Sequence, residues 1–230
     1  DLERFSMIGT TDCEYHGDPA RVEITESEID YLLKVVNAHF RRQLPRGDIL
    51  HTFSGVRPLC DDESDDPSAV TRDYTLALSG KTSEPPLLSV FGGKLTTYRK
   101  LAEAALEHLR PWFPGMADCW TEHASLPGGE NMQSPEQLAR SLTGHSPWLP
   151  PALARRWAHS YGSRSWQIIE GVQNLEQMGE DFGAGLYQRE VDYLCRVEWA
   201  FTAEDILRRR SKLGLFLDAS QQARLQHYLS

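Results

Sequence analysis

The sequence predicts an α+β first part, residues 1–117, followed by an all-α second part, residues 118–230. In the first part, short apolar runs alternate with amphipathic stretches. Pro111, Pro114 and Gly115 then interrupt the pattern. Beyond them only helical spacing of apolar and aromatic residues remains. These three observations place a domain boundary near residue 117.

Composition narrows the class of protein. With 230 residues, 40% of them hydrophobic and 25% charged, the chain is an ordinary globular sequence that can bury a substantial core. A net charge of −9 argues against a nucleic-acid partner, which needs a clustered basic face. No apolar run approaches 18 residues, so no transmembrane helix is expected. The chain begins with Asp1 and enters a strand-like run at once, which suggests a fragment of a longer protein.

The elements expected in the first part follow from local signals. Thr25 and Glu28 have capping-box spacing, and apolar residues on one face carry the helix to about residue 44, before Pro45. The expected strands are residues 2–10, 22–24, 49–56, 74–78 and 87–91. A second helix is expected over residues 96–112, where apolar residues again recur at helical spacing.

The second part reads as a small helical bundle. Its helices are expected at residues 153–161, 166–172, 187–199, 203–217 and 221–229. Asp218 or Ser220 is placed to cap the last of them.

The most informative stretch is residues 89–99, where an apolar strand meets Gly92, Gly93, Lys94, Leu95 and Thr96 before a helix. Glycines at such a junction let backbone N–H groups approach a ligand, and the start of the helix favours negative charge. The turn therefore suits an anionic or electron-rich cofactor edge. A tight turn with a solvated lysine is the alternative interpretation.

A nucleotide phosphate loop does not fit this stretch. That loop needs a glycine where Leu88 stands, and a serine or threonine where Leu95 follows the lysine. No G-x-G-x-x-G turn follows a strand elsewhere in the chain.

Two arginines near strand ends are candidate anion-binding residues. Arg57 follows a predicted strand and precedes a proline, and Arg72 lies just before another strand. Guanidinium groups on stiff backbone suit bidentate capture of phosphate or carboxylate, although a structural salt bridge is the favoured interpretation of each arginine taken singly. Thr10 and Asp12 offer a hydroxyl and a carboxylate after the first predicted strand, or merely form a turn.

Two charged runs have simpler explanations than a binding site. The acidic run 61–66 lacks the glycine bend of a calcium loop, so a solvated loop is favoured and no metal site is expected. The basic run 208–212 is best explained as the solvated face of a helix, with anionic lipid or a partner surface as the alternative. No Ser, His and Asp set is evident, so the proton-transfer group stays unidentified.

Taken together, these motifs resemble the C-terminal half of bacterial aerobic glycerol-3-phosphate dehydrogenases, a family of FAD-dependent, membrane-associated respiratory enzymes. The resemblance covers nearly the whole chain. It is carried by residues 8–12, 53–59, 71–74, 90–99, 179–183 and 208–214.

The resemblance implies an enzyme that oxidises glycerol 3-phosphate to dihydroxyacetone phosphate by hydride transfer to flavin, with electrons passed to a membrane quinone. It implies a two-domain FAD and substrate-cap fold, completed by a helical domain. The enzyme would be cytoplasmic and peripheral on the inner face of the cell membrane, and a homodimer is among the states it allows.

The resemblance also assigns residues. The FAD contacts it implies are Gly55, Val56, Gly92, Gly93, Lys94, Leu95 and Thr96. Arg57, Arg72 and Lys94 correspond to catalytic-site residues, and Thr10 and Asp12 to further substrate contacts.

One departure from the family is large. The dinucleotide-binding first segment of the family, with its G-x-G-x-x-G turn, is absent from this sequence. We therefore expect this chain alone to be inactive. The alternative function is a non-catalytic helical module that contacts a membrane or a protein.

Overall fold

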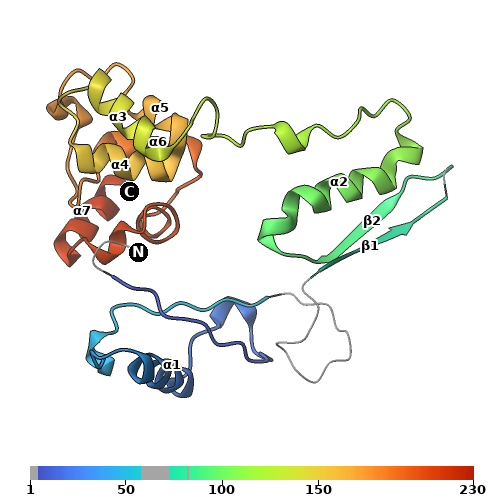
Figure 1. Cartoon of the computed structure of the whole chain (residues 1–230), viewed down its shortest axis with the longest axis horizontal. Coiled ribbons are helices and arrows are strands. Elements are labelled where there is room, and N and C mark those ends of the chain that lie inside the picture. The colour runs from blue at the N-terminus through green and yellow to red at the C-terminus, as the bar shows by residue number, and fades with distance from the viewer. Residues whose placement is uncertain (1–4, 58–72, 82) are drawn as a thin grey trace. The chain divides into compact units, whose positions relative to one another are not determined.

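The computed structural model describes residues 5–57, 73–81 and 83–230 of the chain (Figure 1). The chain divides into two compact units, Asp1–His123 and Ala124–Ser230, and each is considered by itself below. Within the described ranges, no helix is both long and apolar enough to cross a bilayer.

The first helix, α1 (Glu26–His39), has the expected capping box. The Thr25 hydroxyl accepts a hydrogen bond from the Glu28 amide at 3.3 Å, and the Glu28 carboxylate accepts one from the Thr25 amide at 2.9 Å. The prediction that this helix ends near residue 44 is wrong, since α1 ends at His39. The side chain of Asn37 holds the segment after the helix. Its amide group bonds both the N–H and the C=O of Leu44, at 2.8 and 3.1 Å.

Later in this unit the chain forms a β-hairpin followed by a helix (Figure 1). Strands β1 (Tyr74–Ser79) and β2 (Leu87–Gly92) pair antiparallel, with Leu76 opposite Val90. The 3₁₀ turn Leu95–Thr97 leads into α2 (Tyr98–Leu109), which packs against β1. Both strands are confirmed, and the helix expected over 96–112 consists of this turn, α2 and a last 3₁₀ turn.

The other expected strands are absent from the described part of the first unit. Residues 5–10, 22–24 and 49–56 follow extended or irregular paths without strand pairing. A strand exists only where its backbone N–H and C=O groups pair with a neighbour. In the described ranges the only sheet is the two-stranded β1–β2 hairpin, so these segments have no strand to join.

The first unit has no hydrophobic core within its described residues. None of residues 5–57, 73–81 and 83–123 is buried. Large apolar side chains are open to solvent instead, for example Phe53 at 73% and Leu95 at 90% exposure. Segments without buried apolar side chains gain too little hydrophobic free energy to offset the conformational entropy that their backbone loses on folding.

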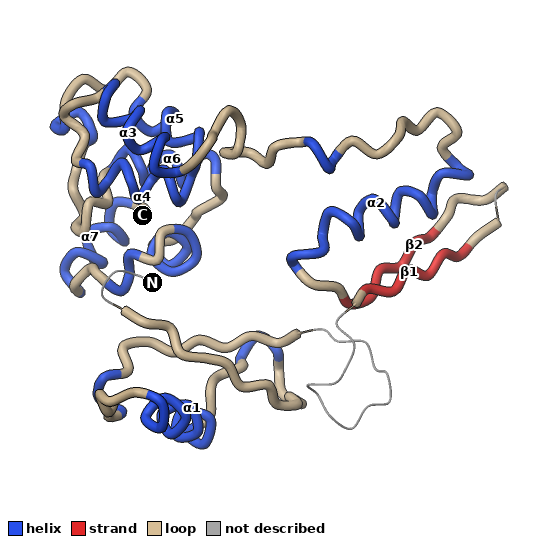
Figure 2. The backbone as a smooth tube through the Cα atoms, in the orientation of Figure 1, coloured by secondary structure: helices blue, strands red, loops and turns tan. Residues whose placement is uncertain are grey.

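The second unit is helical (Figure 2). Its helices are α3 (Pro135–His145), α4 (Pro151–Tyr161), α5 (Ser165–Ile169), α6 (Gln188–Val197) and α7 (Ala219–Tyr228). Asp218 caps α7 by accepting a hydrogen bond from the Gln221 amide at 2.9 Å, which confirms one of the two expected caps. Sequence reasoning missed α3, although Ser134 followed by Pro135 is a typical helix start.

The buried core of the described chain lies entirely in this unit. Helix α3 packs on α4, and α5 packs on α6. The largest fully buried side chains include Trp157, Phe182, Leu142, Leu149, Ile168, Met178, Leu186, Leu194, Ile206 and Leu225. The burial of these apolar side chains stabilises the helical unit.

The prediction of one continuous helix over 203–217 is wrong. The chain forms a six-residue π-helix, Asp205–Arg210, and then the 3₁₀ turn Leu213–Leu215. The break falls at Lys212, whose φ of 62° is left-handed and incompatible with a continuing helix. The Lys212 ammonium group donates to the carbonyl oxygens of Arg208 and Arg209 at 2.8 and 3.0 Å, which satisfies the end of the π-helix.

Candidate functional site

The glycine pair lies in the turn that joins β2 to α2. Gly92 and Gly93 have φ angles of 69° and 102°, a region that L side chains rarely adopt. A Cβ atom at Gly93 would lie 3.2 Å from Leu101 Cδ1 and 3.5 Å from Tyr74 Cβ. Two glycines therefore let the chain leave the strand and enter α2 within a few residues.

Thr97 closes this turn. Its hydroxyl donates to the Lys94 carbonyl at 3.0 Å and accepts from the Lys94 amide at 3.3 Å. Lys94, Leu95 and Thr96 are exposed. The turn thus exposes a cation and an apolar side chain, and this combination suits a planar ring that carries negative charge when reduced.

The structure brings two of the other predicted site residues together. Arg57 Nη1 donates to Asp12 Oδ1 at 2.9 Å, although 45 residues separate them in the sequence. Both side chains are partly exposed, so the pair is accessible to a ligand. Gly55 and Val56, directly before Arg57, are exposed as well, and so is Thr10.

Beside this pair, Thr11 connects the loop to α1. Its hydroxyl donates to Glu28 Oε1 at 2.6 Å. That bond, with the further bonds from the Thr25 amide and hydroxyl, lowers the pKa of the Glu28 carboxyl. Glu28 therefore stays ionised, and it holds the loop that carries Asp12 against the start of α1.

Arg72 lies outside the described residues, as does the acidic run 61–66. The structure thus supports a local cluster of Asp12 and Arg57 and, separately, the turn at Gly92–Thr97. In the described ranges no group of histidine, cysteine, aspartate and glutamate side chains could hold a metal ion.

A buried charged network in the second unit escaped sequence reasoning. Glu190 of α6 is fully buried, and both its oxygens accept hydrogen bonds at 2.6 Å from the guanidinium of Arg156 on α4. The Tyr161 hydroxyl also donates to Glu190, at 2.6 Å. Burial, together with the adjacent Glu190 carboxylate, raises the pKa of Tyr161 far above its usual value, so the phenol stays protonated.

The sequence did contain one signal for this network. Glu190 occupies the apolar stripe of its helix, with Leu194 and Val197 at four and seven residues further on. An acid in that place must be paired. Arg156 also donates to the Gly185 carbonyl at 2.9 Å, so the network joins several parts of the helical unit, and we assign it to stability.

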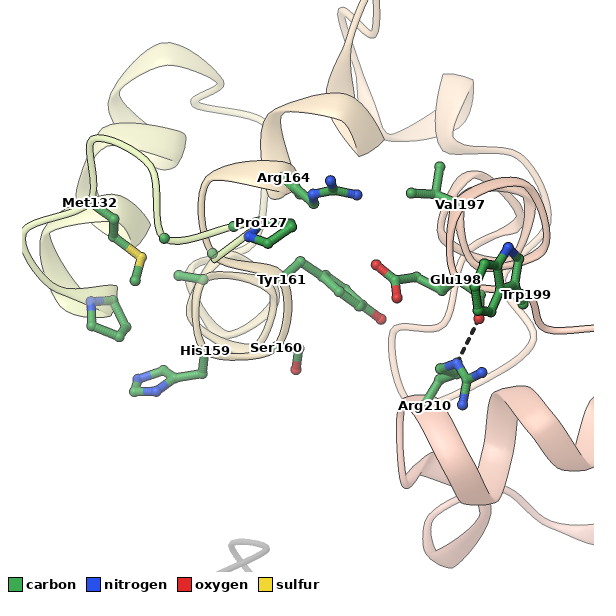
Figure 3. Close-up of a pocket in the computed structure, with 15 residues that line it drawn as sticks. Pro127, Met132, His159, Ser160, Tyr161, Arg164, Val197, Glu198, Trp199 and Arg210 are labelled. Atoms are coloured by element: carbon green, nitrogen blue, oxygen red, sulfur yellow. Dashed lines mark hydrogen bonds between the residues drawn. The ribbon is translucent and has the colours of Figure 1, made fainter. Parts of the chain in front are cut away.

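The second unit also has a surface hollow of about 600 Å³ (Figure 3). Tyr161, Arg164, Glu198 and Arg210 point toward its interior (Figure 3). Two of its charged groups already have partners. Arg210 Nε donates to the Glu198 carbonyl at 2.8 Å, and the Glu198 carboxylate accepts from the Tyr193 hydroxyl at 3.1 Å. These contacts indicate no particular ligand for the hollow.

The basic run 208–212 is used inside the fold. Arg209 forms ion pairs with Glu204 and Asp205, both at 2.9 Å, and Lys212 caps the π-helix. The ion pairs neutralise Arg209, whereas Lys212 keeps its charge because its partners are carbonyl oxygens. Two residues of the run therefore have roles within the helical unit.

Comparison with known proteins shows what the chain is similar to. Residues 2–99 match a family model described as FAD dependent oxidoreductase. Residues 119–227 match a second one, described as the C-terminal domain of alpha-glycerophosphate oxidase. The chain is 64% identical over 99% of its length to glycerol-3-phosphate dehydrogenase of Pseudomonas aeruginosa. The chain closely matches a segment of a bacterial glycerol-3-phosphate dehydrogenase.

Other bacterial dehydrogenases are also similar to this chain. It is 51% identical over 99% of its length to aerobic glycerol-3-phosphate dehydrogenase of Escherichia coli. It is 48% identical over 95% of its length to D-erythritol 1-phosphate dehydrogenase of Brucella abortus. The matches cover 44%, 46% and 43% of the Pseudomonas, Escherichia and Brucella proteins, so the chain spans less than half of each.

The two family models agree with a chain built from an oxidoreductase segment and a helical C-terminal domain. The structure adds that these segments differ in packing. The helical unit has a core, and the described oxidoreductase segment has none.

Proposed function

We propose that this chain is part of an FAD-dependent dehydrogenase that oxidises glycerol 3-phosphate to dihydroxyacetone phosphate. The identity of 64% over almost the whole chain to a protein of that name is the observation that carries the proposal. The glycine turn and the Asp12–Arg57 pair supply the local chemistry such an enzyme needs.

FAD, when bound, supplies a two-electron acceptor for hydride from the carbinol carbon of the substrate. The turn Gly92–Thr97 would hold the ring, and the backbone N–H groups and the start of α2 would stabilise negative charge there. Lys94 would lie between ring and substrate. The oxidoreductase segment would then belong to the FAD and substrate-cap domains of a two-domain flavoprotein.

Arg57 would bind the substrate phosphate or its oxygen substituents, held in place by Asp12. Arg72 would be a second guanidinium of that site, and Thr10 would add a hydroxyl. The same cationic chemistry suits any polyol phosphate, including the D-erythritol 1-phosphate named for one relative. The higher identities to glycerol-3-phosphate dehydrogenases favour glycerol 3-phosphate.

Electrons would pass from the flavin to a membrane quinone, with the enzyme on the inner face of the cell membrane, as a monomer or a homodimer. The alternative, a purely non-catalytic helical module for membrane or protein contact, is less well supported. The ion pairs of Arg209 and the capping role of Lys212 give two residues of the basic run a structural role in the helical unit.

Absorbance spectroscopy tests the proposal. In a full-length enzyme that contains this chain, glycerol 3-phosphate is expected to bleach the visible flavin band, and glycerol without phosphate to leave it unchanged. The chain by itself, mixed with FAD, is expected to oxidise no glycerol 3-phosphate, because the pyrophosphate-binding segment is absent from it. Bleaching by D-erythritol 1-phosphate alone would reassign the substrate, and the absence of flavin would refute the proposal.

A further inference from the structure

Both sequence neighbours of Asp12 interact with one carboxylate of α1. The Thr11 hydroxyl donates to Glu28 Oε1 at 2.6 Å, and the Cys13 thiol adds a weaker interaction with the same carboxylate. Glu28 belongs to the first turn of α1, so these contacts tie the loop on either side of Asp12 to the start of a helix. We call this set of contacts, between Glu28 and residues 11 and 13, the Glu28 clasp.

Asp12 itself bonds a different part of the chain. Its carboxylate accepts the hydrogen bond from Arg57 Nη1 at 2.9 Å. The contacts therefore alternate along the loop, since residues 11 and 13 reach Glu28 and residue 12 reaches Arg57. An extended segment produces this alternation, because successive side chains project to opposite sides. A loop fixed to α1 by residues 11 and 13 thus presents Asp12 to Arg57.

Glu28 is well placed to fix the loop, because both of its oxygens are used. Oε2 accepts from the Thr25 amide at 2.9 Å and from the Thr25 hydroxyl at 2.8 Å, while Oε1 accepts from Thr11. The carboxylate is therefore held in one orientation at the start of α1. The bond from Thr11 is also the largest of the causes that lower the pKa of the Glu28 carboxyl, so the acceptor is ionised and the bond is charge-assisted.

From these contacts we infer that Glu28 is a positioning residue for the substrate site, which acts through the Thr11 loop and Asp12 on the Arg57 guanidinium. The inference rests on the proposed function, in which Arg57 binds the phosphate or the oxygen substituents of the substrate. An arginine side chain has many rotamers, and ordering it on binding weakens affinity. Asp12 holds one arrangement of Arg57 before substrate arrives, and the Glu28 clasp fixes the backbone that carries Asp12.

Glu28 also caps α1, and one substitution separates the two roles. Thr11→Val removes the hydroxyl that bonds Glu28 Oε1. It leaves both bonds of the capping box, between Thr25 and Glu28, in place. A change in substrate binding caused by Thr11→Val therefore reports the clasp and not the cap.

Steady-state kinetics of a full-length enzyme that contains this chain tests the inference. Thr11→Val is expected to raise KM for glycerol 3-phosphate by about fivefold, the effect of one hydrogen bond, with kcat changed by less than about twofold. Thr11→Ser restores the hydroxyl and should restore the wild-type KM. Glu26→Ala is the matched control, because Glu26 is an acid of the same helical turn that pairs with Arg46, and its KM should stay unchanged. An unchanged KM in Thr11→Val, or an equal rise in Glu26→Ala, would overturn the inference.

The Arg57→Ala background distinguishes positioning from a general loss of stability. If the clasp acts through Arg57, Thr11→Val should cause no further change in KM once Arg57 is replaced, whereas independent effects would multiply. The same fivefold rise in both backgrounds would overturn the inference. If Arg57→Ala alone leaves kcat/KM unchanged, the role of Arg57 in the proposed function fails, and this inference fails with it. If Arg57→Ala lowers kcat/KM and Thr11→Val has no effect, only the inference about Glu28 fails.

Discussion

Replacing Arg156 with leucine is expected to destabilise the helical unit by about 3–5 kcal/mol, because the substitution leaves the Glu190 carboxylate buried without its cation. Glu190 has no exposure to solvent, so water cannot replace the lost bonds. A loss of this size is a large fraction of the total stability of a domain.

Urea unfolding of the full chain, followed by circular dichroism, measures this effect. The transition reports the helical unit, since the buried core of the described chain lies there. Arg209→Leu is the control, because it breaks an ion pair whose arginine is 52% exposed and should cost no more than about 1 kcal/mol. The double variant Arg156→Leu, Glu190→Leu should recover much of the stability. Similar midpoints for Arg156→Leu and Arg209→Leu would contradict the assigned role of the network.

Replacing Arg57 with alanine should lower kcat/KM for glycerol 3-phosphate by about 10- to 150-fold in a full-length enzyme that contains this chain. A charge-assisted hydrogen bond contributes about 1.5–3 kcal/mol, which corresponds to that range. Steady-state kinetics with an artificial electron acceptor measures the change without involving quinone.

Arg46→Ala is the matched control for Arg57. Arg46 is 46% exposed, compared with 49% for Arg57, and it also forms ion pairs with acids, Glu26 and Asp30. Its partners are in the first turns of α1, away from the predicted site residues in the sequence. An unchanged kcat/KM is therefore expected for Arg46→Ala. If both substitutions lower kcat/KM equally, Arg57 has only a structural role.

Local signals predicted local structure well. The capping boxes at Thr25 and Asp218, and the glycines between β2 and α2, each act within a few residues. Such contacts are determined by neighbours in the chain, so one sequence is enough to read them. The family resemblance was also readable, because its motifs keep their order and spacing over nearly the whole chain.

Long-range structure was harder to predict. In the described ranges the strand patterns at 49–56 and 5–10 do not join the β1–β2 sheet, since strand formation depends on a neighbouring strand that sequence pattern cannot supply. The Asp12–Arg57 pair joins residues 45 apart, and the Arg156–Glu190 pair joins residues 34 apart. The sequence identified the members of the first pair and gave no indication that they would meet.

A crystal structure of a full-length enzyme containing this chain, with FAD bound, tests most directly whether the turn at Gly92–Thr97 holds the redox ring. We expect backbone nitrogen atoms of this turn within about 3.5 Å of the isoalloxazine, and the Arg57 guanidinium directed toward the same cavity. A turn that faces solvent, with Arg57 directed away from the flavin, would contradict the proposed site.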